Sequence, residues 1–393
     1  MSELQALDKA FVAGTYARFP VEIVRGEGSL MYDAEGKCYI DMGTGIAVNA
    51  FGVCDPVWVA AVTEQLSRVQ HTSNLYYTEP CARLAGELCT KTGLKKVFFG
   101  NSGAEANECA IKVARKYAAE HKGAEYSTIV TLQNSFHGRT LTTLAATGQE
   151  HYHELFQPLT PGFVHTPAND LAAMEALVRE HKVAGILMEI VQGEGGVIAL
   201  EEDFVRGVAA LCAREDIILM IDEVQTGNGR TGALYAYMHY GITPDVVTTA
   251  KGLGGGLPIG ACLLGEKVES VLGHGDHGST FGGNPVACAG ACSILSRIDD
   301  ALLAGVRERA AYIRETLQSA KGVKSVSGMG LMIGVETERP ASEIVRDCMA
   351  RGVLCLTAKS RVRLLPALNI PMDVLKKAVA TICEVAAMEG DKA

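Results

Sequence analysis

The chain has 393 residues, which at roughly 150 residues per domain predicts two or three domains. Its 36 Lys and Arg against 45 Asp and Glu give a net charge of −9, and 48% of the residues are hydrophobic. This composition excludes a disordered chain, which would have fewer apolar residues and more net charge. It also argues against a general nucleic-acid-binding protein, because contacts with a phosphate backbone need a basic face.

The N-terminus and the cysteines predict a cytoplasmic protein. The first 14 residues include Glu3 and Asp8 and lack a basic stretch followed by an apolar one, so we expect no signal peptide. The apolar runs are far shorter than the ~20 residues that a membrane helix needs. The 12 cysteines contain no C-x-x-C pair, which favours reduced thiols over a disulfide framework. The paired histidines in 151–153 and 274–277 lack a matching Cys or Glu cluster, so we expect no metal.

In chain order, the first predicted element is a short hairpin over residues 21–41 with its turn at 33–36. Through the middle of the chain, short β-branched runs alternate with longer amphipathic patterns. This alternation is typical of a mainly parallel α/β sheet covered by helices on both faces. The expected strands are 96–99, 127–132, 184–189, 217–221, 246–249 and 260–264, and the clearest helices are 104–120 and 203–214.

After Gly282 the chain becomes helix-rich, with short strands expected near 323–335 and 362–365. The fold class is therefore α/β, with a large domain at 52–281 and a smaller α+β domain at 282–393. The N-terminal segment, residues 1–51, is assigned to the small domain.

Polar residues and glycines follow several predicted strands, at the sheet edge where open α/β folds bind ligands. After the strand at 96–99, a turn ends at Gly103 and a helix begins. The free N–H groups of Gly103 and Ala104, with the hydroxyl of Ser102, form a candidate anion site. A Ser-capped helix without a ligand explains the same residues equally well.

Asp222 and Glu223 end another apolar strand, as in a nucleotide triphosphatase, but no upstream segment has the required phosphate-binding loop. Residues 227–232 fit the glycine pattern of dinucleotide-binding proteins. That pattern starts five residues beyond the strand, and Asp245 precedes the next strand instead of following it. An NAD-dependent dehydrogenase is therefore a disfavoured alternative.

Lys251 follows a third apolar strand and precedes four glycines within five residues. Such glycines let a bulky group approach the backbone, and a desolvated lysine has a lowered pKa and can form a Schiff base. A lysine that extends from a flexible loop into solvent is the alternative. In the loop 133–140, Phe136 lies three residues before Arg139, which favours ring stacking together with carboxylate binding.

An anion site, a lysine nucleophile, an aspartate at a strand end and a stacking aromatic ring are together what pyridoxal phosphate requires. The aspartate keeps the pyridine nitrogen protonated, so that the ring can accept electrons.

At these residues the sequence resembles the class III (ω-amino acid) aminotransferases of fold type I, over nearly the whole chain. The resemblance is carried by residues 25–28, 45–49, 101–107, 136–140, 192–196, 222–227, 237–241, 251–256 and 278–285. It implies a pyridoxal 5'-phosphate enzyme that forms a homodimer with shared active sites. One departure is Glu189-Ile190, where the family usually has Glu-Pro, and we expect only a small backbone effect from it.

The resemblance also implies a role for each matching residue. At the cofactor these are Lys251 as Schiff-base lysine and acid-base catalyst, Asp222 at the pyridine nitrogen, Gln225 at the ring hydroxyl, Val224 and Phe136 on the ring faces, Ser102, Gly103 and Ala104 at the phosphate, Glu189 and Glu223 as supporting acids, and Thr280 at the phosphate of the other subunit. At the substrate they are Arg139 and Arg363 as carboxylate-binding residues, Glu194 as the acid that neutralises Arg363 while the amine donor is bound, and Ser279.

The implied reaction transfers the ω-amino group of N2-acetyl-L-ornithine to 2-oxoglutarate, giving glutamate, as a step of arginine biosynthesis. Ornithine, succinylornithine, N-succinyl-diaminopimelate and 4-aminobutyrate are alternative donors within the family.

Overall fold

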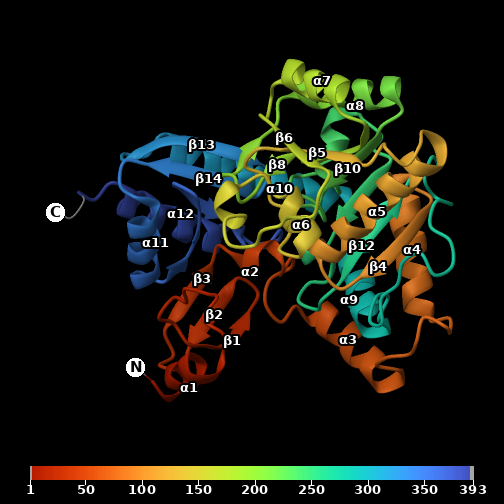
Figure 1. Cartoon of the computed structure of the whole chain (residues 1–393). Helices are drawn as coiled ribbons and strands as arrows, with labels where there is room; N and C mark the ends of the chain where they lie inside the picture. The colour runs from red at the N-terminus through yellow and green to blue at the C-terminus, as the bar shows by residue number, and fades with distance from the viewer. Residues whose placement is uncertain (1, 390–393) are drawn as a thin grey trace.

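The structure is a computed structural model that describes residues 2–389. A seven-stranded sheet forms the centre of the molecule (Figure 1). From one edge to the other its strands are β4 (Lys96–Gly100), β12 (Gly260–Leu264), β11 (Val246–Thr249), β10 (Ile218–Asp222), β7 (Val183–Glu189), β5 (Thr128–Leu132) and β6 (Phe163–Thr166). The six strands expected from the sequence are all present in this sheet, which confirms the α/β class.

Two features of this sheet were not expected. The edge strand β6 was missed, because its sequence Phe-Val-His-Thr is short and half polar. The second unexpected feature is the direction of β12. It pairs antiparallel with both β11 and β4, while the remaining neighbours in the sheet pair parallel. The sheet is thus mainly parallel with one reversed strand.

Both faces of the sheet are buried, as the apolar runs indicated. In β10, Ile218 and Met220 pack in one hydrophobic cluster with α5, while Leu219 and Ile221 pack in a second cluster with α8. Successive side chains of a strand point to opposite faces, so a strand apolar at every position needs helices on both sides. The helices around this sheet are α3 (Pro56–Arg68), α4 (Glu79–Thr92), α5 (Gly103–His121), α6 (Leu141–Ala146), α7 (Leu171–Glu180), α8 (Glu202–Glu215) and α9 (Pro285–Leu295).

Short elements connect the strands and helices of this central part. They are the 3₁₀ turns η1 (Glu150–Tyr152), η2 (Ala236–Tyr240) and η3 (Lys251–Leu253), and the two-stranded ribbon of β8 (Val191–Gln192) and β9 (Ile198–Ala199).

The two ends of the chain come together beside the large sheet (Figure 1). The expected hairpin forms with its turn at 33–36, and its last strand pairs in parallel with β15 from the C-terminal part. This first small sheet contains β1 (Ile23–Glu27), β2 (Leu30–Asp33), β3 (Cys38–Asp41) and β15 (Val353–Leu354); the second contains β13 (Val323–Met329), β14 (Met332–Thr337), β17 (Arg361–Leu364) and β16 (Leu356–Ala358).

The helices of the terminal parts are α1 (Glu3–Phe11), α2 (Thr44–Ala47), α10 (Asp300–Gln318), α11 (Ala341–Ala350) and α12 (Met372–Ala386). Pairing of β3 with β15 supports the assignment of the N-terminal segment to the small domain, and the exact boundaries stay a prediction.

Within residues 2–389, no helix combines the length and the apolar character needed to cross a bilayer.

Candidate active site

A cavity of about 460 Å³ lies where the ends of β4, β10 and β11 meet the loop after β5. This is the sheet edge at which the sequence predicted a ligand site. The predicted residues that line it are Ser102, Gly103, Ala104, Phe136, Arg139, Glu189, Asp222, Val224, Gln225 and Lys251. Residues from loops more than 100 positions apart in the chain therefore share one pocket, whose size suits a small-molecule ligand.

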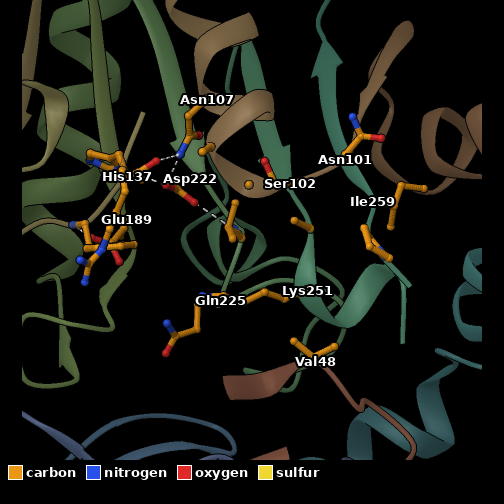
Figure 2. Close-up of a pocket in the computed structure, with 18 of the residues that line it drawn as sticks. Val48, Asn101, Ser102, Asn107, His137, Glu189, Asp222, Gln225, Lys251 and Ile259 are labelled. Atoms are coloured by element: carbon orange, nitrogen blue, oxygen red, sulfur yellow. Dashed lines mark hydrogen bonds and ion pairs between the residues drawn. The ribbon is translucent and has the colours of Figure 1, made fainter. Parts of the chain in front are cut away.

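Asp222, the last residue of β10, is held by three donors (Figure 2). Its Oδ2 accepts a hydrogen bond from Nδ2 of Asn107 at 2.8 Å, and Nδ1 of His137 lies at the same distance. Its Oδ1 accepts one from the backbone N–H of Val224 at 3.0 Å. Because a carboxylate can only accept, His137 carries a proton on Nδ1. These bonds fix the direction of the carboxylate, which is itself buried.

Asn107 holds this arrangement from α5. The hydroxyl of Thr248 donates to its Oδ1 at 2.6 Å, and its Nδ2 donates to the backbone carbonyl of His137 at 2.8 Å as well as to Asp222. With its oxygen and both N–H groups engaged, the amide cannot flip without losing all three bonds. The side chain of Asn107 thus connects β11, β10 and the loop after β5 to one another.

The N-terminus of the 19-residue helix α5 forms another wall of the cavity. Ser102 caps the helix, because its Oγ accepts a hydrogen bond from the N–H of Glu105 at 3.2 Å. The N–H groups of Gly103 and Ala104, the first two of the helix, have no acceptor inside it, and both residues line the cavity. A Cβ on Gly103 would lie 2.6 Å from Cγ1 of Val224, so only glycine fits here. The serine cap and the anion-binding geometry therefore coexist.

Lys251 lies two residues beyond the end of β11, and its side chain lines the cavity near Gln225 (Figure 2). Its backbone has φ of +45°, a strained conformation for a residue with a side chain. Burial lowers the pKa of Lys251, although the carboxylates of Glu194 and Asp222 act in the opposite direction. A lowered pKa increases the fraction of neutral amine, which is the nucleophilic form.

Glu189 ends β7 beside Asp222 and joins two loops of the site. Its Oε1 accepts a hydrogen bond from the N–H of Phe136 at 2.9 Å, and its Oε2 accepts one from the N–H of Gly193 at 3.1 Å. Burial raises the pKa of Glu189 to about 7. The next residue, Ile190, at the position where proline is usual in the family, is fully buried.

Arg363 reaches the edge of the cavity from β17 in the second small sheet. It is only 3% exposed, and its Nη1 donates to Oε1 of Glu194 at 2.5 Å and to Oε1 of Gln225 at 3.3 Å. Its Nε has no acceptor among the described residues. A buried guanidinium with an unused N–H is able to bind a further oxygen ligand. Neither Arg363 nor Glu194 lines the cavity itself, and Gln225 connects them to it.

Arg139 occupies the outer side of the cavity and is held by aromatic rings. Its guanidinium lies 4.6 Å from the ring centre of Tyr152 and 5.8 Å from that of Phe136. The two rings meet edge to face, with centroids 6.0 Å apart. Within residues 2–389 Arg139 makes no ion pair, so its donors are available for an anion.

Glu223 is, like Thr280, a predicted cofactor-binding residue that lies outside the cavity lining, and its contact with the cofactor stays a prediction. Its carboxylate accepts hydrogen bonds from the hydroxyl of Thr226 at 2.5 Å and from the N–H of Tyr237 at 2.8 Å, and burial raises its pKa to about 7. Glu223 directly follows the end of β10, and its carboxylate is turned towards these two donors. Glu223 thereby holds the chain that follows β10.

Ser279 and Thr280 also lie outside the cavity lining. The Oγ of Ser279 accepts hydrogen bonds from Nδ2 of Asn101 at 3.2 Å and from the N–H of Gly282 at 2.8 Å, and Asn101 lines the cavity. Thr280 is exposed on the surface. An exposed position is compatible with contact to a second subunit, which a single chain does not contain.

Sequence reasoning missed the roles of Asn107, His137 and Tyr152. A signal existed for Asn107, because it lies four residues after Gly103 on the same helix face. His137 directly follows Phe136 in the loop 133–140, and a titratable side chain at that place is a signal for a role in the site. Tyr152 carried no signal, since its contact with Arg139 depends on how the segment 147–153 folds back.

The chain belongs to the class III aminotransferases: the model of that family, described as Aminotransferase class-III, matches residues 11–385. An acetylornithine aminotransferase of Haemophilus ducreyi is 50% identical over 385 residues, which cover 98% of both chains. A succinylornithine transaminase of Yersinia enterocolitica is 45% identical, with 96% of this chain and 95% of the relative covered.

Solved structures agree with this assignment. An ornithine aminotransferase from Toxoplasma gondii superposes with a TM-score of 0.93 at 31% identity, covering 98% of this chain and 94% of the other. An N-acetylornithine aminotransferase from Stenotrophomonas maltophilia gives 0.85 at 33% identity, covering 97% and 98%. The expected fold and family are thereby confirmed, and the chain is a pyridoxal-phosphate-dependent aminotransferase.

Proposed function

We propose that this aminotransferase moves the ω-amino group of N2-acetyl-L-ornithine to 2-oxoglutarate and serves arginine biosynthesis. The observation that carries the proposal is one cavity that contains Lys251, Asp222 and the N-terminus of α5, with Arg363 paired to Glu194 at its edge. The 50% identity to a relative named for this donor supports the choice of substrate.

The residues present fit pyridoxal phosphate. Gly103 has no side chain and so leaves room for the side chain of Val224 against the helix N-terminus, and the free N–H groups of the first turn suit a phosphate. Val224 and Phe136 line the cavity between this end and the arginines, as expected for the two faces of a ring. Asp222 is placed to hold a pyridinium nitrogen, and Gln225 the ring hydroxyl. When bound, the cofactor supplies an electron sink for the carbon that loses its proton.

The chain's own residues then perform the proton transfers and the positioning. Lys251, whose pKa is lowered by burial, is the group that takes up and returns the proton at its Nζ. Asp222 keeps its charge directed at one point, because Asn107 and His137 hold its Oδ2 from two sides. Glu189 holds the loop of Phe136 against the loop of Gly193 through its two hydrogen bonds.

Two substrates use the same site in turn, and the charges at its edge allow this. While the amine donor is bound, Glu194 occupies Arg363, so that Arg139 alone binds the donor's carboxylate. When 2-oxoglutarate enters, Glu194 moves away and Arg363 binds the α-carboxylate of the dicarboxylate. The side chain of Glu194 is 26% exposed and that of Arg363 is 4% exposed, so the acid is the partner that is free to move.

The proposed enzyme is a homodimer, with Thr280 of each subunit binding the cofactor phosphate of the other. Large apolar side chains are exposed next to Thr280 at Phe281 and on the segment before α4. That segment contains Leu75, Tyr76 and Tyr77 and is joined to the Thr280 loop by Asn74, whose Nδ2 donates to the carbonyls of Ser279 and Gly282. Large exposed apolar side chains on adjoining segments are typical of a subunit interface. The 12 cysteines are free thiols in the structure, which supports the cytoplasmic location that the sequence predicts.

A panel of amine donors with 2-oxoglutarate as acceptor tests the proposal. N2-acetylornithine should give the highest kcat/KM, ahead of succinylornithine, ornithine, succinyl-diaminopimelate and 4-aminobutyrate. A higher value for succinylornithine would assign the chain to the function of its 45% identical relative. No transfer from any of the five donors would reject the proposed substrate class.

A further inference from the structure

Trp58, the only tryptophan of the chain, is bonded to the loop that carries Lys251. Its indole N–H donates to the carbonyl of Gly254 at 2.9 Å. The N–H of Gly254 in turn donates to the carbonyl of Lys251 at 3.0 Å, which closes the turn η3. The carbonyl of Gly254 also accepts a longer bond from Leu257 at 3.3 Å. A short chain of hydrogen bonds therefore links α3 to the backbone of the lysine.

The indole ring also packs closely against this loop, at the side of a smaller cavity that Trp58, Gly255 and Gly256 line. A Cβ on Gly255, whose φ is +59°, would lie 3.0 Å from Nε1 of Trp58, and one on Gly290 of α9 would lie 2.8 Å from the same atom. A Cβ on Gly256 would be 3.6 Å from the ring, and Gly256 lines the cavity. The ring thus lies behind one wall of the active site, between that wall and α9.

The position of Trp58 is itself fixed. Oδ1 of Asp55 caps α3 by accepting the backbone N–H of Trp58 at 2.9 Å. Both carboxylate oxygens of Asp55 pair with the guanidinium of Arg297, at 2.8 and 3.0 Å. Arg297 lies over the ring of Phe51 at 3.9 Å. A two-point ion pair of this kind is more rigid than a single contact, so the indole rests on a firm support.

We propose that Trp58 is a positioning residue for Lys251: its ring and N–H hold the glycine-rich turn so that the lysine amine meets the cofactor. This inference rests on the proposed role of Lys251. Four glycines in residues 252–256 give the loop a large backbone freedom, which an outside contact must restrict. Lys251 needs such restriction because its backbone is already in a strained conformation.

The test compares the wild type with Trp58→Phe, which removes the N–H and half of the ring. We expect the dissociation constant of pyridoxal phosphate to rise about fivefold and kcat at saturating cofactor to fall about fivefold, while KM for the donor changes less than twofold. The pH midpoint of the visible band of the bound cofactor should shift by about half a unit, because the geometry around the lysine changes. Val57→Ala, an exposed change on the same helix, should alter none of these.

A second variant separates positioning from folding. Benzothienylalanine at position 58 keeps the two-ring shape and lacks the N–H, so it should fold normally and still raise the dissociation constant of the cofactor. Unchanged cofactor affinity, pH midpoint and kcat in both variants would overturn the proposal. In the wild-type apoprotein, adding the cofactor should quench the emission of Trp58. If the wild type shows this quenching and Lys251→Ala loses the visible band, the proposed function stands even if the role of Trp58 fails.

Discussion

The two ends of the cavity are built in different ways. At the cofactor end, Asp222 is buried and accepts three hydrogen bonds, from the helix α5, the loop after β5 and the chain that follows β10. At the substrate end, Arg139 is exposed and Arg363 depends on a half-exposed glutamate from another loop. A group that stays bound through both half-reactions needs fixed partners, whereas substrates that alternate need partners able to exchange. The difference in burial and bonding thus matches a difference in task.

The two ends of the cavity also differ in the helices and strands that build them. The fixed end uses strands of one sheet and the helix that covers it, so its geometry is set by the core. The movable end brings together β17 of the small sheet and the β8–β9 loop, which belong to different parts of the fold. The substrate end therefore depends on how these two parts pack together, whereas the cofactor end is built within one part.

The largest expected effect is at the fixed end. Replacing Asp222 with Ala removes the charge opposite the pyridine nitrogen, and kcat should fall about 10³-fold or more, equivalent to ~4 kcal/mol. Steady-state rates with N2-acetylornithine and 2-oxoglutarate measure it.

Asp222→Asn serves as the matched control, because it keeps the size of the side chain and removes only the charge. A loss close to that of the alanine variant shows that charge is the cause. Turnover near the wild-type value in Asp222→Ala would contradict the assigned role.

At the movable end, the effect should fall on one half-reaction. For Arg363→Ala we expect kcat/KM for 2-oxoglutarate to drop about 100-fold, since a buried, charge-assisted carboxylate contact is worth about 3 kcal/mol. The half-reaction with the amine donor should change less than threefold in single-turnover measurements.

Arg361→Ala tests whether any arginine of β17 gives this result. Arg361 pairs with Glu336 at 3.2 Å instead of Glu194. Its loss should affect both half-reactions equally and weakly. An equal and large loss in both half-reactions for Arg363→Ala would disprove an exchange between Glu194 and substrate at that arginine.

A smaller effect sharpens the comparison at the fixed end. Asn107→Ala removes the amide that bonds Asp222, Thr248 and His137, so kcat should fall about tenfold. The free energy of unfolding should fall by about 1–3 kcal/mol, because buried polar groups lose their partners. Thr248→Val removes only the bond that sets the amide's orientation and should cost less on both measures. A stability loss without any change in kcat would restrict Asn107 to a structural role.

The parts of the fold that the sequence could predict are those with local signals. Strands such as Ile218–Asp222 are apolar runs that end in a polar residue, and the cap of α5 follows from Ser102. The reversal of β12 could not be predicted, because an apolar strand buried on both faces looks the same in either direction. The left-handed turn at Thr44–Ala47 has no local signal either, since β-branched residues disfavour positive φ.

The candidate site shows the same division. That Lys251 and Asp222 share a cavity could be predicted, because Asp222 ends one strand, Lys251 lies just beyond another, and strand ends converge in an open sheet. Glu223 was included among the cofactor-binding residues through the family resemblance, and its buried contacts with Thr226 and Tyr237 could not be predicted from the sequence. The support of Asp222 by Asn107, over a separation of 115 residues, depends on long-range packing that a single sequence does not show.

The smallest expected effect is on the pH dependence of the protein's stability. It arises at His165, behind the cofactor end of the cavity, and should leave catalysis unchanged. His165 in β6 packs near His153, with ring centroids 6.0 Å apart, and its Nδ1 lies 2.6 Å from the hydroxyl of Thr131. Thr131 donates its own proton to the carbonyl of Ala146, so His165 must donate from Nδ1 to the hydroxyl of Thr131. Burial lowers the pKa of His165 to about 4, and the positive charge that His153 would carry acts in the same direction.

Because the pKa of His165 is lower in the folded state than in the unfolded chain, the unfolded chain binds more protons between about pH 6.5 and pH 4. Its contribution to stability is therefore complete above pH 6.5 and is lost as the pH falls towards 4, by at most about 3 kcal/mol. His165→Asn should flatten this acid loss, measured as urea midpoints of the apoprotein from pH 7 to pH 4.5 at one protein concentration. His151→Asn, a change at an exposed histidine, is the control and should keep the wild-type slope. A His165→Asn variant with the same slope as the wild type would show that this histidine titrates equally in both states.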